Sequence, residues 1–227
     1  MQKNTYPGKF IVFEGIDGSG KSIQLKLLLN RLKKEGYNTA FFDFPQYGKK
    51  SAGLAEEYLS GAYGSAREVG PFRSSIFYAC DRYDASFQLK KYLKEGRIVV
   101  SDRYVGSNMA HQGGKIKSQK EREKFFAWLH ELEYEIFGIP KPTKSFFLHV
   151  PLEIAGKLRE NPERRKKKKK DIHETDFEHL KNAQHAYLHA MKVFPKDFTA
   201  IECAPKGILL APKIIHEKIW KEVKKLL

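Results

Sequence analysis

A glycine-rich segment carries the residue types that bind nucleotide phosphates. Residues 13–22 read FEGIDGSGKS and fit the spacing G-x-x-x-x-G-K-[ST], with an apolar run before them and a helix-like stretch after them. Glycines let backbone N–H groups approach phosphate oxygens without a Cβ in the way, and the start of a helix favours an anion. The lysine can reach the β- and γ-phosphates, and the following hydroxyl can ligate Mg²⁺. We therefore predict an ATP site at Gly15–Ser22, formed by Gly15, Gly18, Ser19, Gly20, Lys21 and Ser22.

An acidic and a basic residue follow the third apolar run. Asp102 comes directly after RIVVS, and Arg103 follows it. A carboxylate at the carboxyl end of a strand beside the phosphate loop can hold Mg²⁺, so Ser22 and Asp102 are the predicted metal ligands. A guanidinium fixed at the same strand end suits bidentate contact with a phosphate. The alternative for Asp102 is that it only caps the next turn.

The phosphate loop by itself does not separate GTPases, ATPases and small-molecule kinases. GTPases read guanine with an N/TKxD pattern, and no such pattern follows a later apolar run of this sequence. The prediction therefore favours a kinase.

Alternating apolar and amphipathic stretches must position these residues. Five apolar runs are rich in β-branched and aromatic residues, and their nearly continuous apolarity indicates a parallel sheet covered on both faces. They span residues 9–14, 39–44, 97–101, 145–150 and 198–203. Amphipathic stretches separate them at about 21–35, 52–60, 71–95, 119–137, 152–159, 177–193 and 209–227. The alternation predicts a three-layer α/β fold, and the lack of a Gly/Ser/Pro linker predicts one domain over 1–227.

Composition limits the class of protein. The 227 residues are 41% hydrophobic and 30% charged, which is typical of a globular protein. No run approaches the roughly 18 apolar residues of a membrane span, and the N-terminus lacks the apolar core of a signal peptide. Two cysteines give no disulfide framework, so we expect a cytoplasmic protein without a membrane partner. The net charge of +15 invites a nucleic-acid partner, but seven positive charges lie in the single run Arg164–Lys170, so we do not expect one.

Several segments resemble thymidylate kinases, in the family's own order along the chain. DRYVGSNMAHQG at 102–113 is similar to the family's DRY…S…AYQG signature, and FEGIDGSGKS resembles its phosphate loop, including Asp17. FPQYG at 44–48, IFYACDRY at 76–83 and GIPKPT at 138–143 resemble further family elements. The resemblance implies phosphorylation of dTMP to dTDP with ATP and Mg²⁺. It further implies a P-loop fold with five parallel strands in the order 2-3-1-4-5, helices on both faces, and a homodimer.

The resemblance also implies a role for each residue of the acceptor site. Asp17 would accept a hydrogen bond from the sugar 3′-hydroxyl, and Arg103 would hold the 5′-phosphate of dTMP. With Lys21, Arg164 and Arg165 they form the expected catalytic set. Tyr78 would stack on the pyrimidine, while Arg82, one helical turn later, donates to its carbonyl oxygen. The alternatives are a core aromatic and a surface ion-pair partner. The predicted substrate-binding residues are Asp17, Phe44, Tyr47, Tyr78, Arg82, Arg103, Ser107, Asn108, His111, Gln112 and Glu174.

Three positions depart from the usual family residue. Tyr47 replaces the Arg of many members, so one phosphate contact becomes a hydroxyl hydrogen bond. Tyr78 replaces the usual Phe and keeps the aromatic face. His111 stands where Tyr is usual, at a position credited with excluding a ribose 2′-hydroxyl, so discrimination between deoxyribose and ribose stays open.

A basic segment at about 159–175 falls where the family has a lid over ATP. The centre of the phosphate loop holds no basic residue, so the resemblance assigns Arg164 and Arg165 to stabilising charge on the transferred phosphoryl group. Glu174 would contact the sugar side. The alternatives are a solvated charge run, or a targeting or polymer-binding segment.

Two other functions stay open on the sequence. One is a kinase of another pyrimidine nucleotide or of a deoxynucleoside, whose hydroxyl would need a base such as Glu14 or Asp17. The other, from a different class, is a nucleic-acid-associated P-loop ATPase that uses the positive charge. Both keep the phosphate loop and differ in what binds beside it.

Overall fold

A five-stranded parallel sheet forms the centre of the computed structural model, which describes residues 6–160 and 177–227. The strands lie in the order β2-β3-β1-β4-β5, which confirms the predicted topology. Their bounds are Lys9–Glu14 for β1, Thr39–Asp43 for β2, Ile98–Asp102 for β3, Lys144–His149 for β4 and Phe198–Glu202 for β5. Each predicted strand is confirmed, with its ends shifted by a single residue at most.

Burial explains which segments became strands. Phe10–Phe13 of β1 are fully buried, and β3 and β4 are buried over most of their length because helices cover both faces of the sheet. β2 and β5 keep exposed residues, since each lies at an edge and has a neighbouring strand on one side only. The nearly continuous apolar runs of the inner strands follow from this double cover.

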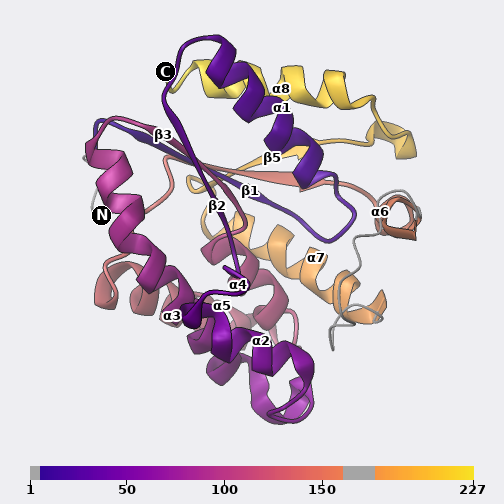
Figure 1. Cartoon of the computed structure of the whole chain (residues 1–227). Helices are drawn as coiled ribbons and strands as arrows, with labels where there is room; N and C mark the ends of the chain where they lie inside the picture. The colour runs from indigo at the N-terminus through magenta and orange to yellow at the C-terminus, as the bar shows by residue number, and fades with distance from the viewer. Residues whose placement is uncertain (1–5, 161–176) are drawn as a thin grey trace.

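Helices cover both faces of this sheet (Figure 1). On one face lie α1 (Lys21–Lys34) and α8 (Pro212–Lys224), which pack against each other. The other face carries a second group, α3 (Ala66–Lys94), α4 (Val105–Gly113), α5 (Gln119–His130) and α7 (Phe177–Val193). Shorter elements connect them: η1 (Lys50–Ala52), α2 (Gly53–Ser60), η2 (Glu131–Ile136), α6 (Leu152–Glu160) and η4 (Pro205–Gly207).

The register of the sheet gathers the predicted chemistry at one edge. Phe13 of β1 pairs with Asp102 of β3, so the two strands end side by side. Because parallel strands share their carboxyl edge, the phosphate loop leaves β1 next to the point where Arg103 leaves β3. Ligands of open α/β sheets bind at this edge.

The largest departures from the expected helix ranges lie in α3 and at the end of α5, and α4 was not among the expected amphipathic stretches. α3 begins at Ala66, five residues before the expected start, because Ser65 and Glu68 form a capping box that satisfies the first N–H groups. Gly70, with φ 74°, kinks the helix just before Pro71, the residue at which the expected helix began. The expected helix over 119–137 is α-helical only to His130 and continues as the π-helix η2.

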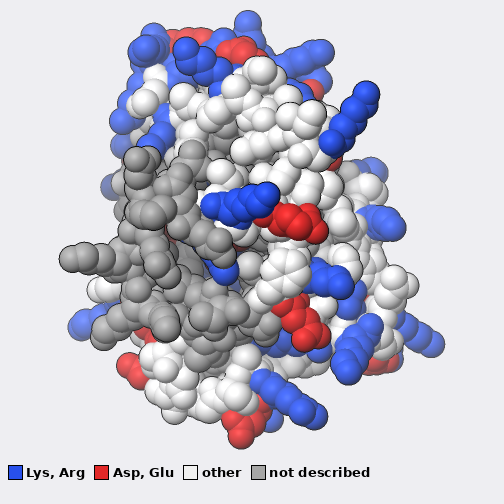
Figure 2. All heavy atoms as spheres, turned by 90° about the vertical axis from the view of Figure 1, so that its right-hand side faces the viewer, with Lys and Arg blue, Asp and Glu red and all other residues white. Residues whose placement is uncertain are grey.

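Positive charge is scattered over the face where α6 lies (Figure 2). Lys and Arg side chains are separated there by Asp, Glu and uncharged residues on the described surface. The visible part of this face therefore does not offer the continuous basic track that a nucleic acid would follow.

Within residues 6–160 and 177–227, no helix combines the length and the apolar composition that crossing a membrane requires.

Candidate active site

The phosphate loop joins β1 to α1 and depends on glycine at three positions. Gly15, Gly18 and Gly20 have φ values of 145°, 86° and 87°, which side chains with a Cβ rarely adopt. A Cβ on Gly18 would lie 2.1 Å from the carbonyl oxygen of Ala155, so α6 packs directly on the loop backbone. The predicted loop is therefore present, with its backbone N–H groups at the start of α1.

Lys21 lies in the centre of this loop. Its Nζ donates to the carbonyl oxygens of Gly15 at 2.9 Å and Ile16 at 3.2 Å, and the side chain is buried. Burial and the neighbouring positive charge of Arg103 lower the pKa of Lys21, while nearby carboxylates raise it. The hydroxyl of Ser19 is also buried and has no hydrogen-bond partner among the described residues. Both groups can bind phosphate oxygens.

The predicted metal ligands fit a hard divalent cation. Asp102 ends β3, and its Oδ1 is buried without a hydrogen-bond partner in the described chain. Ser22 lies exposed in the first turn of α1. Mg²⁺ takes oxygen ligands and needs only one or two from the protein when nucleotide phosphates supply others.

Arg103 connects the phosphate loop to α4. Its φ is 66°, in the left-handed region, and its Nη2 donates to Asp17 Oδ1 at 2.6 Å. Its Nη1 donates to Ser107 Oγ at 3.2 Å and to His111 Nε2 at 3.0 Å. Burial alone would lower the pKa of Arg103, but Asp17 and the other acidic neighbours raise it above its ordinary value, so the guanidinium stays charged. Four of the predicted site residues thus form one connected group.

Glu14 lies fully buried beneath that group. Its carboxylate accepts from the backbone N–H of Tyr104 at 3.0 Å, from Ser107 Oγ at 2.5 Å and from Tyr187 Oη at 2.9 Å. Burial raises the pKa of Glu14, and the bonds from Ser107 and Tyr187 and the charge of Arg103 oppose that rise. Because both oxygens are occupied inside the protein, Glu14 does not face a substrate hydroxyl, which argues against a nucleoside kinase that uses it as base.

Arg82 is part of a buried ion pair that sequence reasoning missed. Its Nε and Nη2 donate to the two carboxylate oxygens of Glu133 at 2.5 and 2.6 Å, and both side chains are buried. Asn108 donates to Glu133 Oε1 at 3.3 Å, which brings α3, α4 and η2 together. The Oδ1 atom of Asn108 is buried and has no hydrogen-bond partner in the part of the chain that is described. Glu133 lies in a helical run without a motif, so no sequence signal marked it.

The remaining predicted site residues differ in how far they are buried, and some lie outside the described residues. Gln112 is buried and accepts a hydrogen bond from Ser74 Oγ at 2.7 Å. Phe44 is a core residue stacked on Phe42, whereas Tyr47 in the same loop is half exposed. Tyr78 is half-buried and meets Tyr58 edge-on at 6.2 Å. Arg164, Arg165, Glu174 and nearly all of the expected lid lie outside the described residues.

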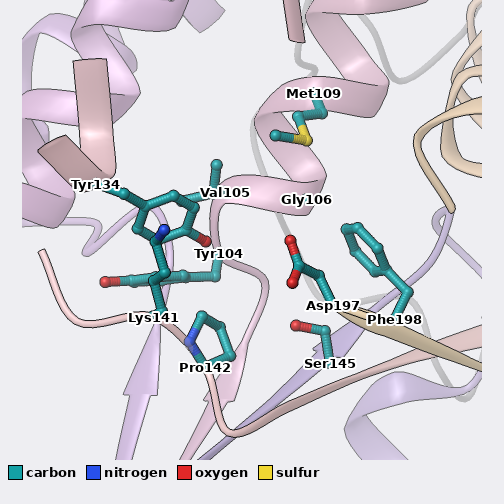
Figure 3. A pocket seen from close by; sticks show the side chains of 10 residues that line it. All are labelled: Tyr104, Val105, Gly106, Met109, Tyr134, Lys141, Pro142, Ser145, Asp197 and Phe198. Atoms are coloured by element: carbon teal, nitrogen blue, oxygen red, sulfur yellow. The ribbon is translucent and has the colours of Figure 1, made fainter. Parts of the chain in front are cut away.

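A small cavity lies behind α4 (Figure 3). Its lining residues come from the start of α4 and the residue before it, from η2, and from the amino ends of β4 and β5 with the segments that precede them. The cavity holds about 30 Å³, room for a water or two but not for a nucleotide. No predicted substrate-binding residue lines it. It is therefore separate from the candidate active site.

The family model for thymidylate kinase matches residues 13–211. The chain belongs to the thymidylate kinase family. A thymidylate kinase of Caldanaerobacter subterraneus subsp. tengcongensis is 30% identical over 224 residues, which cover 97% of each chain. One from Mycobacterium tuberculosis is 30% identical over 170 residues, 74% of this chain and 78% of the relative.

A solved structure supports the fold independently. The thymidylate kinase of Candida albicans superposes with a TM-score of 0.73 at 19% identity, covering 96% of this chain and 92% of that one. The predicted enzyme class is confirmed: the chain is a nucleoside monophosphate kinase, and the family's reaction is phosphorylation of dTMP by ATP. Neither alternative function gains support from these relatives.

The Arg82–Glu133 pair gives a stability prediction. Glu133→Gln keeps the shape but leaves the Arg82 charge buried without its carboxylate, and removing one partner of a buried pair costs about 3–5 kcal/mol. We expect the free energy of unfolding, measured by urea denaturation, to fall by about that amount. Glu135→Gln is the matched control, because Glu135 pairs with Lys141 and is 52% exposed. Equal losses in the two variants would contradict the assigned role of the pair.

Proposed function

We propose that this site transfers the γ-phosphoryl group of ATP to dTMP, with Arg103 holding the acceptor phosphate. One observation carries the assignment: Arg103 contacts Asp17 of the phosphate loop at 2.6 Å. The group that would hold the acceptor therefore already touches the loop that would hold the donor. When dTMP binds, its phosphate can replace the Asp17 carboxylate on the guanidinium, and Asp17 becomes available to the sugar 3′-hydroxyl.

Positioning and charge account for the proposed catalysis. The acceptor phosphate of dTMP is already an anion, so the transfer needs no strong base. Lys21 would bind the β- and γ-phosphates from one side and Arg103 the acceptor phosphate from the other, which reduces repulsion between two anions and orients them in line. Mg²⁺, held by Asp102 and Ser22, would neutralise charge on the ATP phosphates.

The base would lie against α3 and α4. Asn108 presents a buried Oδ1 without a described partner, which suits the N–H of a pyrimidine ring. Tyr78 would stack on the ring, and Arg82, oriented by Glu133, would donate to a carbonyl oxygen. Because Arg82 is also paired with the buried Glu133, an Arg82→Ala change would affect folding as well as dTMP binding.

The proposal extends to the domain organisation, the lid segment and the cellular compartment. Residues 1–227 would form one domain, and a basic lid at about 159–175 would supply Arg164 and Arg165 to the transferred phosphoryl group. Two free thiols, Cys80 and Cys203, are typical of a reducing compartment, which favours the cytoplasm.

A substrate panel tests the proposed function. ADP release is measured with ATP and Mg²⁺ against dTMP, dUMP, UMP, CMP, AMP and thymidine. We expect the highest kcat/KM for dTMP, and loss of the signal in Lys21→Met, because that change removes the cation from the phosphate loop. A preference for another acceptor would contradict the dTMP assignment and leave the reaction class intact.

A homodimer is also proposed, because α3 exposes an apolar stripe. Phe72, Ile76, Tyr83 and Phe87 are all exposed, and their spacing of four, seven and four residues places them on one side of the helix. Contiguous exposed apolar surface marks an interaction site. The family resemblance implies pairing through this helix, so the expected occupant is a second copy of the chain.

Light scattering on a gel-filtration column tests the dimer. The wild-type protein should elute with twice the mass of one chain, and Phe87→Glu should elute with the mass of a single chain because it places a charge in the stripe. Ile214→Glu is the matched control, since Ile214 is 51% exposed on α8 across the sheet. A monomeric wild-type protein would refute the dimer.

A further inference from the structure

Two histidines meet behind the phosphate-binding arginine. His111 lies in the last turn of α4, and His179 lies in the first turn of α7. Nδ1 of His111 is 3.1 Å from Nε2 of His179, and the two rings stack at 5.3 Å with an angle of 27° between their planes. On the other side of His111, Nε2 is 3.0 Å from Nη1 of Arg103. A chain of side chains thus runs from α7 through α4 to the end of β3.

The direction of every hydrogen bond in this chain follows from the arginine. A guanidinium only donates, so Nε2 of His111 must accept and carries no proton. The His111 ring is then neutral with its proton on Nδ1, and it donates that proton towards Nε2 of His179. Nε2 of His179 accepts in turn, so the His179 ring carries its proton on Nδ1. The geometry therefore fixes both tautomers.

α7 supports the same arginine at a second point. Tyr187, two turns along α7, places its hydroxyl 2.7 Å from Ser107 Oγ, and Ser107 accepts from Arg103. The ring of Tyr187 also meets His111 edge-on at 6.2 Å. The hydroxyl of Ser107 donates its own proton to Glu14, so towards Arg103 it can only accept. Two acceptors of the Nη1 atom, Ser107 and His111, therefore each contact a residue of α7.

We propose that His179 is a positioning residue for dTMP binding: by accepting the Nδ1 proton of His111, it stabilises the tautomer in which Nε2 of His111 accepts from the Arg103 guanidinium and orients it. This inference rests on the proposed function, in which Arg103 holds the acceptor phosphate. It adds a dependence on α7, because the acceptor that orients Arg103 is in place only while α7 is docked on α4. His179 itself touches neither reacting group.

Imidazole ¹⁵N spectra of the wild-type protein test the geometry directly. Both rings should show a protonated Nδ1 and an unprotonated Nε2 at neutral pH. In His179→Leu the fixed acceptor is lost, so His111 should populate the Nε2–H tautomer as well. In His179→Gln the side-chain carbonyl can still accept from Nδ1 of His111, so His111 should keep its wild-type spectrum. A protonated Nε2 on His111 in the wild-type protein would overturn the proposal.

Steady-state kinetics test the consequence. His179→Leu should raise KM for dTMP about fivefold, the effect of one ordinary hydrogen bond, while KM for ATP stays within about twofold of wild type. His179→Gln should restore KM for dTMP. His185→Leu, an exposed histidine of the same helix, is the matched control and should change neither constant. An unchanged KM for dTMP in His179→Leu, or equal changes in both constants, would refute the positioning role.

These outcomes separate the inference from the function on which it rests. If the wild-type protein has no activity on dTMP, the proposed function fails, whatever the histidine spectra show. If the wild-type protein phosphorylates dTMP and His179→Leu has unchanged KM for dTMP, the function stands and the role of His179 fails.

Discussion

The positive charge of Arg103 is the constraint on which the site depends. Its side chain is only 17% exposed, so the guanidinium needs acceptors inside the protein. Those acceptors come from the phosphate loop through Asp17 and from α4 through Ser107 and His111. Satisfying one buried charge therefore fixes the loop, the end of β3 and the active-site helix relative to one another.

Two buried carboxylates, Glu14 and Glu133, hold the elements around this site together. Glu14 binds the start of α4 through the backbone of Tyr104 and binds α7 through Tyr187. Glu133 performs the same task further from the phosphates, where it holds Arg82 and Asn108. The guanidinium groups of Arg82 and Arg103 are thus bound by protein side chains before substrate is present. Because these groups are already oriented when dTMP arrives, the entropic cost of binding is lower.

The sequence predicted what is encoded locally and missed what depends on distant contacts. The five strands followed from the apolar runs and their order from the family resemblance, and the structure confirms both. The phosphate loop was visible in the spacing of its glycines and lysine. Glu133 and His179 had no signal, since their partners lie 51 and 68 residues away. The early start of α3 was missed because polar capping at Ser65, rather than apolar periodicity, sets it. Roles assigned to the lid arginines stay predictions.

The affinity of Arg103→Lys for dTMP and for thymidine, measured by calorimetry, tests the central claim most directly. Lysine keeps the charge but loses the planar fork, so dTMP affinity should fall about tenfold or more, the effect of a charge-assisted hydrogen bond. Thymidine, which has no phosphate, should bind both proteins equally, and ATP affinity should change by less than about threefold. Equal losses for dTMP and thymidine, or no loss for dTMP, would contradict the assignment of Arg103 to the acceptor phosphate.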